Sequence, residues 1–402
     1  MYPELSGPAS SIPLRGVTFQ RLTRGGVPTM KSLRIAAMTA ALGFAACTEK
    51  KVEAPPPPKP VETKPVPAPV PPPVAEERAP KECAAPLDPG PTTEFKFGDR
   101  AAKLSGARLT FADKDADGTL TFGVLGPVNE DSGLNMLALK KYLKFFADEK
   151  ADAIIVTGDV GEVAGGISRV LEELATSKLP VFVVIGNREC RAEFTDGFDA
   201  AKARNANLIN LNQVRVVEFP ELTLVSLPGH HDPEYINCKT GCQYFKSTIA
   251  EVVTAAKEAK TPVALIAHGP PRGKGSLALD FVGAGGNVGD EAITKAIGDA
   301  KIAFGLFSNI KEAGGRATSD ADGTTLVKEG EGSKSLFVNP GPADTTTGWE
   351  LNDGTTAIGL AAVFKVKDGE GSYKLLRLKP PTAAEKAEAR KLDPPARDQK
   401  AE

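Results

Sequence analysis

Four short apolar stretches, each followed at once by polar residues, limit the folds open to this chain more than any other feature. The stretches are Ala153–Thr157, Val181–Ile185, Val263–Ala267 and Ile302–Phe307. Apolar runs of this length are typical of strands that are covered on both faces. Segments with apolar residues at helical spacing separate them, and this alternation predicts an α/β fold.

The rest of the chain extends the same alternation and ends in a strand-rich part. We predict helices at 134–146, 167–174, 192–204, 249–259 and 291–297, and further strands at 120–125, 214–219, 222–227, 336–339, 358–366 and 373–378. The closing strands add antiparallel pieces to the sheet. Asp117-Gly118 suits a tight turn, so we also predict a hairpin between Ala107–Phe111 and Thr119–Leu125.

Polar residues stand at the ends of the four apolar strands. They are Gly158-Asp159, Gly186-Asn187-Arg188-Glu189, His268-Gly269-Pro270-Pro271 and Ser308-Asn309-Ile310-Lys311. In α/β folds, ligands bind just beyond the carboxyl ends of the strands, so these side chains are expected to converge. Asp, Asn and His are oxygen and nitrogen donors that suit Mn, Fe or Zn.

The charge balance points away from nucleic acid. The chain has 49 basic and 51 acidic residues among 402, so neither sign dominates. We therefore expect no nucleic-acid partner.

The segment Met30–Cys47 has the order of an export signal. Two basic residues come first, an uncharged apolar run follows, and the run ends in FAAC at Cys47. The run is too short to span a bilayer. It resembles a bacterial lipoprotein signal peptide, which implies signal 30–46 and lipidation of Cys47; an ordinary cleaved leader is the alternative. A mis-assigned start codon ahead of Met30 would explain residues 1–29.

A proline-rich tether follows, which we place at 47–95. Proline fixes φ and removes backbone donors, so this stretch should be extended polyproline II. At ~3.1 Å per residue, about thirty residues reach roughly 90 Å, which suits a spacer between a membrane and a domain. Thr48 stands where many lipoproteins of the inner membrane carry Asp. By resemblance we expect a lipid anchor in the outer membrane, facing the periplasm.

Four cysteines remain once Cys47 carries lipid, and an exported chain can oxidise them to two disulfides. Only three residues separate Cys238 from Cys242, so we predict that these two close a small loop on each other. Cys83 and Cys190 would then form the second pair. A zinc site on the C-x3-C spacing is the alternative.

Four motifs match those of a known family in order and spacing. They are TGDV at 157–160, IGNRE at 185–189, AHGPP at 267–271 and VNPGP at 338–342. From about residue 120 to 378 the chain resembles the calcineurin-like metallophosphoesterases. The resemblance implies an α-β-β-α fold, a two-sheet sandwich flanked by helices, which we assign to residues 96–380, with 381–402 as a charged tail.

The resemblance also implies a set of site residues. The family's site holds two divalent metals that clamp phosphate and activate water. By resemblance, Asp159 would bridge the two ions, and Asn187 and His268 would bind one of them. Two divalent ions of Mn, Fe or Zn are expected as cofactors if the site is active.

Other motifs of the family are lost. The Asp-x-His motif should follow the strand that ends at Leu125, but Gly126-Pro127-Val128-Asn129 stands there. Lys311 replaces the last His of the Gly-His-x-His motif, and a protonated lysine cannot bind metal. Arg188 replaces the His that assists the leaving group. We predict that Arg188 and Lys311 bind an anion, with Arg188 contacting phosphate, or that they pair with Asp159.

We therefore expect a cell-envelope lipoprotein with a largely eroded two-metal site and a binding or structural role. Its expected partners are the membrane, through the lipid anchor, and a phosphate-bearing ligand. The alternative is an active metal-dependent phosphoesterase with a rearranged ligand set, in which His230 and His231 replace lost ligands.

Overall fold

The computed structural model describes residues 81–97, 100–114 and 117–394. The predicted signal peptide, Cys47 and most of the predicted tether lie outside these residues. In the described part of the chain, none of the helices combines the length and the apolar character that a membrane crossing requires.

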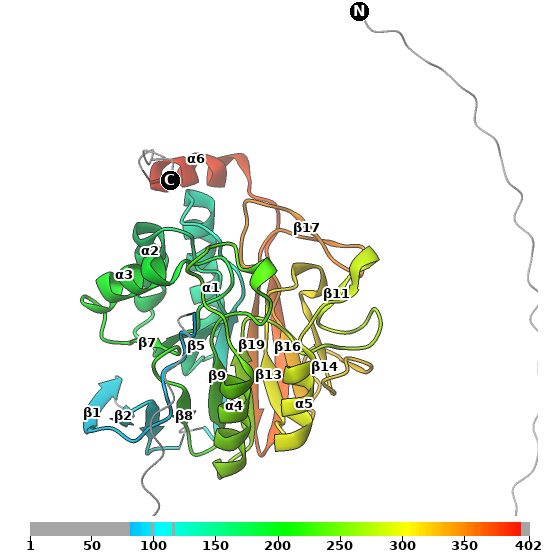
Figure 1. The fold of residues 1–402 in the computed structure, drawn as a ribbon. Helices are drawn as coiled ribbons and strands as arrows, with labels where there is room; N and C mark the ends of the chain where they lie inside the picture. Colours follow the sequence, from blue (N-terminus) through cyan, green and yellow to red (C-terminus); the bar gives the residue numbers. More distant parts are fainter. Residues whose placement is uncertain (1–80, 98–99, 115–116, 395–402) are drawn as a thin grey trace, which may run out of the picture. The chain divides into compact units, whose positions relative to one another are not determined.

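Two large sheets contain most of the described strands (Figure 1). The ten-stranded sheet has the order β1 (Thr92–Phe97), β2 (Arg100–Ser105), β3 (Arg108–Phe111), β8 (Val216–Glu218), β9 (Thr223–Leu227), β10 (Val263–Ala267), β13 (Phe304–Leu306), β16 (Leu336–Asn339), β14 (Arg316–Thr318) and β15 (Leu326–Val327). The six-stranded sheet has the order β20 (Glu370–Arg377), β19 (Leu360–Lys367), β4 (Thr119–Leu125), β5 (Ala153–Val156), β6 (Val181–Val183) and β7 (Leu208–Asn210). Parallel strands occupy the centre of both sheets, as the alternation of strand and helix predicts.

Three apolar cores separate four layers. Alternate residues of the strands, such as Phe122 and Ile266, fill the space between the two sheets. The other residues of the six-stranded sheet pack against α1 (Gly133–Asp148), α2 (Ala164–Ala175) and α3 (Arg191–Lys202). Those of the ten-stranded sheet pack against α4 (Lys246–Glu258) and α5 (Glu291–Ala300). Figure 1 shows the two helix groups on different sides of the strands. The predicted α/β sandwich flanked by helices is confirmed.

The predicted hairpin between Ala107–Phe111 and Thr119–Leu125 is wrong. β3 pairs with β2 and β8 in one sheet, whereas β4 pairs with β5 and β19 in the other. The residues of β4 after Thr119 are all buried, because one face meets the inter-sheet core and the other meets α1. A strand covered on both faces gains most from neighbours on both edges, so β4 takes a central place.

Several short elements surround the ends of the central strands. They are η1 (Pro233–Tyr235), η2 (Gly283–Gly285), η3 (Lys311–Ala313), the pair β11 (Phe281–Val282) with β12 (Gly286–Asn287), and the pair β17 (Trp349–Glu350) with β18 (Thr356–Ala357). The last helix, α6 (Ala383–Leu392), lies within the predicted charged tail and packs on α1. Asp393 Oδ1 accepts a hydrogen bond from the Gly133 amide at the start of α1.

The structure forms two disulfides, as predicted, but the predicted pairing is wrong. Cys83 bonds to Cys242, and Cys190 bonds to Cys238. The loop 229–243 runs between two other segments and pairs with each of them. The Gln243 amide donates to the Lys81 carbonyl on one side, and on the other the Arg191 amide donates to Thr240. Cys238 and Cys242 therefore meet different neighbours, and their short spacing did not decide the pairing.

Candidate functional site

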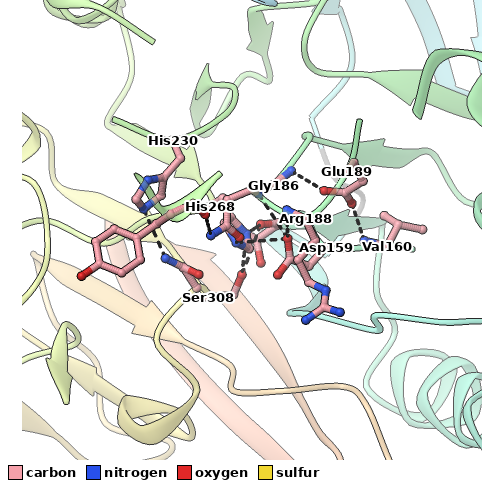
Figure 2. A network of polar contacts seen from close by, with 12 residues as sticks. Asp159, Val160, Gly186, Arg188, Glu189, His230, His268 and Ser308 are labelled. Carbon is pink, nitrogen blue, oxygen red and sulfur yellow. Dashed lines mark hydrogen bonds and ion pairs between the residues drawn. The ribbon is translucent and has the colours of Figure 1, made fainter. Parts of the chain in front are cut away.

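Three predicted donors meet at the carboxyl ends of strands from both sheets. Asp159 follows β5, Asn187 follows β6, and His268 follows β10 of the other sheet. His268 Nε2 lies 3.0 Å from Asn187 Oδ1 and 3.3 Å from Asp159 Oδ1. All three side chains are buried, and Figure 2 shows Asp159 and His268 at the centre of this network. The site therefore spans the junction of the two sheets.

A tight backbone turn after β5 positions Asp159. Gly158 has a φ of 100° and Asp159 has a φ of 57°, and the left-handed region is unfavourable for residues with a Cβ. A Cβ on Gly158 would lie 2.7 Å from His268 Nδ1, so this position requires glycine. The Asp159 carbonyl accepts hydrogen bonds from the amides of Val128 and Asn129, which hold the turn in place.

The Asp159 carboxylate uses one oxygen and leaves the other without a partner. Oδ1 accepts hydrogen bonds from the amides of Asn187 (3.2 Å) and Arg188 (3.1 Å). Oδ2 is buried and has no hydrogen-bond partner in the described residues. Burial alone would raise the pKa of Asp159, but His268, followed by Lys311, lowers it to about 2. The site thus contains an ionised carboxylate with one unused acceptor oxygen.

Both ring nitrogens of His268 face acceptors. Nδ1 donates to the Thr157 carbonyl at 2.7 Å, and Nε2 points at the oxygens of Asn187 and Asp159. Only the imidazolium form satisfies both sides. Burial lowers the pKa of His268, but the charge of Asp159 outweighs burial and raises the pKa above its usual value. His268 and Asp159 therefore form a buried ion pair.

Glu189 connects the two loops that carry Asp159 and Asn187. It is fully buried, Oε1 accepts from the Val160 amide at 2.6 Å, and Oε2 accepts from the Gly186 amide at 3.0 Å. Figure 2 shows both bonds. Burial, followed by the charge of Asp159, raises the pKa of Glu189 to about 8.

His230 lies on the side of His268 that faces away from Asp159 (Figure 2). It is buried, and its Nε2 is 3.3 Å from Asn309 Nδ2. Burial, followed by the charge of His231, lowers the pKa of His230 to about 4, so this ring is neutral at neutral pH. The loop 229–243 therefore brings a neutral imidazole to the edge of the site.

The buried ion pair predicts how stability changes with pH. His268 and Glu189 have raised pKa values and His230 has a lowered one, so between about pH 6.5 and 8, where the opposite contribution of His230 has ended, the folded protein holds more protons than the unfolded chain. The free energy of unfolding should fall by roughly 1–3 kcal/mol as pH rises through this window. Chemical denaturation at pH 6.5, 7 and 8 measures it. Glu189→Gln should reduce the slope and Glu193→Gln should keep it. A wild-type stability that is flat or rises with pH would contradict the ion pair.

With this geometry established, comparison with known proteins gives a family. Residues 133–301 match the family model described as calcineurin-like phosphoesterase. The chain carries a calcineurin-like phosphoesterase domain. A search of curated proteins gives no match.

Solved structures show weak similarity over most of the domain. TT1561 of Thermus thermophilus is 13% identical, with a TM-score of 0.46, over 65% of this chain and 100% of its own. A dimetal phosphatase from Danio rerio is 12% identical, with a TM-score of 0.40, over 65% of this chain and 99% of its own. GAP50, the anchor in the inner membrane complex of Plasmodium, is 12% identical, with a TM-score of 0.39, over 68% of this chain and 93% of its own. At these scores the likeness carries no argument about function.

The calcineurin-like phosphoesterase domain retains donors that fit one divalent ion. Two ligands held about 2.1 Å from one ion lie roughly 3.0–3.4 Å apart at ordinary coordination angles. The separations of 3.0 and 3.3 Å from His268 Nε2 to Asn187 Oδ1 and Asp159 Oδ1 fall in this range. The unused Asp159 Oδ2 is a further donor. Binding an ion here requires His268 to lose the proton on Nε2.

The second ion of the family does not fit this domain. The side chain of Val128 has no donor atom. Asn129 donates its side-chain amide to Asp344 Oδ2, and its Oδ1, buried and without a partner in the described residues, offers one neutral oxygen where the motif has an Asp and a His. Lys311 adds a positive charge close enough to lower the pKa of Asp159. Across the described residues there is no group of three or more His, Cys, Asp or Glu side chains arranged to hold an ion. A two-ion site would lack ligands and face repulsion.

Arg188 and Lys311 have different surroundings in the structure. The Arg188 guanidinium pairs with Glu162 at the edge of the site. The Lys311 ammonium lies 4.9 Å from the centre of the Trp349 ring, and the residue is almost completely buried. Neither side chain forms an ion pair with Asp159, although the Arg188 amide binds it. Their role in binding an anion stays a prediction.

Two residues of the site were not assigned a role from the sequence. The sequence does contain an indication for Glu189, because a carboxylate that directly follows Asn187 and Arg188 at a strand end is expected to accept hydrogen bonds there. The sequence contains no indication that Trp349 contacts Lys311, because the two residues are far apart in the chain and the residues around Trp349 form no recognisable motif.

Proposed function

We propose that this protein is a cell-envelope lipoprotein whose calcineurin-like phosphoesterase domain binds an anionic, phosphate-bearing ligand and does not hydrolyse it. The observation that carries the proposal is Lys311. This buried cation stands where the family motif has a metal-binding His, and its charge acts on Asp159. A fixed ammonium there opposes a second divalent ion and favours an anion.

The envelope location rests on the signal-like segment 30–47 and is supported by the oxidised cysteines. Structural disulfides persist in oxidising compartments and are rare where thiols are kept reduced. Both disulfides join segments far apart in sequence, with separations of 159 and 48 residues. We propose anchoring through lipidated Cys47 in the outer membrane, with the domain facing the periplasm.

A second function is favoured by the donors that remain. Asp159, Asn187 and His268 are spaced to hold one ion, and a divalent ion held there supplies Lewis-acid polarisation of a phosphoryl oxygen. Neutral His230 and Asn309 border the same place. Under this alternative the protein is a metal-dependent phosphoesterase with a rearranged ligand set.

Metal analysis and a hydrolysis assay separate the two functions. Purified protein is incubated with Mn, Fe or Zn, its metal content is measured, and a generic phosphodiester is supplied. We expect at most one equivalent of bound metal and no turnover above that of Asp159→Asn. Asp196→Asn, an exposed carboxylate on α3, is the matched control. Bound metal together with turnover that Asp159→Asn abolishes and Asp196→Asn retains would overturn the proposal in favour of the phosphoesterase.

A further inference from the structure

Lys311 is a buried cation without an anionic partner. It is 9% exposed, and in the described part of the chain its ammonium has neither an ion-pair partner nor a hydrogen-bond acceptor. The ammonium lies 4.9 Å from the centre of the Trp349 ring, a cation–π contact that leaves its N–H donors available to a ligand. The position therefore lacks an acceptor.

Trp349 has the same deficit. Its indole Nε1 is buried and has no acceptor among the described residues. Indole nitrogen can only donate, so an unpaired N–H donor of Trp349 lies beside the ammonium of Lys311. Buried donors are normally paired, and an unpaired indole N–H beside an ammonium suits an oxygen ligand with negative charge.

The element that covers Lys311 is weakly connected to the rest of the domain. β17 and β18 form the hairpin 349–357. Its apolar side chains Trp349, Leu351 and Ala357 pack with Leu360 in a small cluster that is separate from the three main cores. Gly348 precedes it, and Gly359, with a φ of 96°, follows it. A segment with few buried contacts and glycine at both ends can open without unfolding the domain.

Asn352 holds this hairpin closed. Its amide donates to the Glu312 carbonyl in η3, and its Nδ2 donates to the Phe281 carbonyl in β11, both at 2.8 Å. These two bonds connect the tip of the hairpin to the segment that carries Lys311 and to the neighbouring hairpin β11–β12. Loss of the side-chain bond should raise the open population.

We propose that hairpin 349–357 is a gate over Lys311, and that the ammonium of Lys311 and the indole N–H of Trp349 bind an oxyanion, the phosphate or carboxylate group of a small molecule. The gate rests on the proposed binding function and specifies it. It assigns the anion to Lys311 and Trp349 and leaves Arg188 with Glu162.

The single tryptophan of the chain makes the gate measurable, because intrinsic tryptophan fluorescence reports Trp349 alone. Purified protein is titrated with inorganic phosphate and, separately, with acetate, at constant ionic strength set by sodium chloride. We expect a saturable change with one of the two anions, and the anion that gives it identifies the chemical group. Lys311→Met should weaken the response about tenfold or more, the effect of losing a charge-assisted hydrogen bond.

Two further variants control the result. Lys334→Met, an exposed lysine of the same chain, should leave the titration unchanged. Asn352→Ala should make Trp349 more accessible to acrylamide quenching in the absence of ligand. Thermal unfolding checks that each variant folds. No saturable response to either anion, equal affinity in Lys311→Met, or unchanged quenching in a folded Asn352→Ala would overturn the gate.

The gate and the proposed function fail in different ways. Metal-dependent turnover together with a Lys311-dependent fluorescence response would overturn the non-hydrolytic function and support the gate. Absence of both turnover and response would overturn the gate and leave intact the absence of hydrolysis, which is the part of the proposed function that the turnover assay tests.

Discussion

Replacing both Cys83 and Cys242 with alanine is expected to lower the free energy of unfolding by about 4–5 kcal/mol. The bond joins residues 159 apart, and closing a loop of that length removes much of the entropy of the unfolded chain. Both cysteines are buried, so the substitution also removes apolar contacts. Guanidinium denaturation followed by circular dichroism measures the loss.

The second disulfide provides the comparison. Replacing Cys190 and Cys238 opens a shorter loop, with a separation of 48, and should cost about 4 kcal/mol or slightly less. This bond holds the loop 229–243 against the loop of Asn187, so its removal should also change the surroundings of the site. A loss below about 1 kcal/mol for the Cys83 and Cys242 variant would refute the stabilising role of that bond.

Glu189→Ala is the second substitution with a large expected effect, a loss of about 3 kcal/mol or more. The change leaves the amides of Val160 and Gly186 buried without acceptors and creates a cavity at a fully buried position. It also separates the two loops that position Asp159 and Asn187. Denaturation measures stability, and the fluorescence titration of Trp349 reports whether the site is retained.

Two variants bracket this effect. Glu189→Gln keeps one oxygen acceptor and should cost about half as much, roughly 1–2 kcal/mol. Glu193→Ala removes a single hydrogen bond to the Ala164 amide at the start of α2, at a partly buried position, and should cost about 1 kcal/mol. If Glu189→Ala costs no more than Glu193→Ala, Glu189 does not connect the two loops in the way described.

The fold was predictable where burial on both faces leaves a strong pattern. The strands at 153–157, 181–185 and 263–267 correspond to β5, β6 and β10, and the predicted helices at 134–146 and 291–297 correspond to α1 and α5. Strands at the edges were missed. The residues of β1 before Phe97 are all exposed, and β7 has only three residues, so neither shows the apolar run of a central strand.

Long-range pairing was the part that local patterns did not decide. β3 and β4 adjoin in sequence with a turn signal between them, yet each pairs in a different sheet. Cys238 and Cys242 are neighbours in sequence, yet each bonds to a different segment. In both cases the tertiary contacts of the flanking segments outweigh short spacing.

The site was predictable in its donors but not in its charges. The carboxyl ends of β5 and β6 in one sheet lie next to that of β10 in the other, which brings Asp159, Asn187 and His268 together. The sequence did not show that Arg188 pairs with Glu162, because that partner is on another loop. It also did not show that Trp349 covers Lys311, since this contact joins two segments that local spacing does not relate.

The two disulfides also determine how the domain would respond to tension. Near the start of the domain, Cys83 is bonded to Cys242 in the loop 229–243. The same loop is bonded through Cys238 to Cys190, which directly follows Glu189. If the N-terminus is fixed to a membrane and a ligand is held at the site, a force between them runs through sulfur–sulfur bonds and a few residues of backbone. The strands and their cores would carry little of that load.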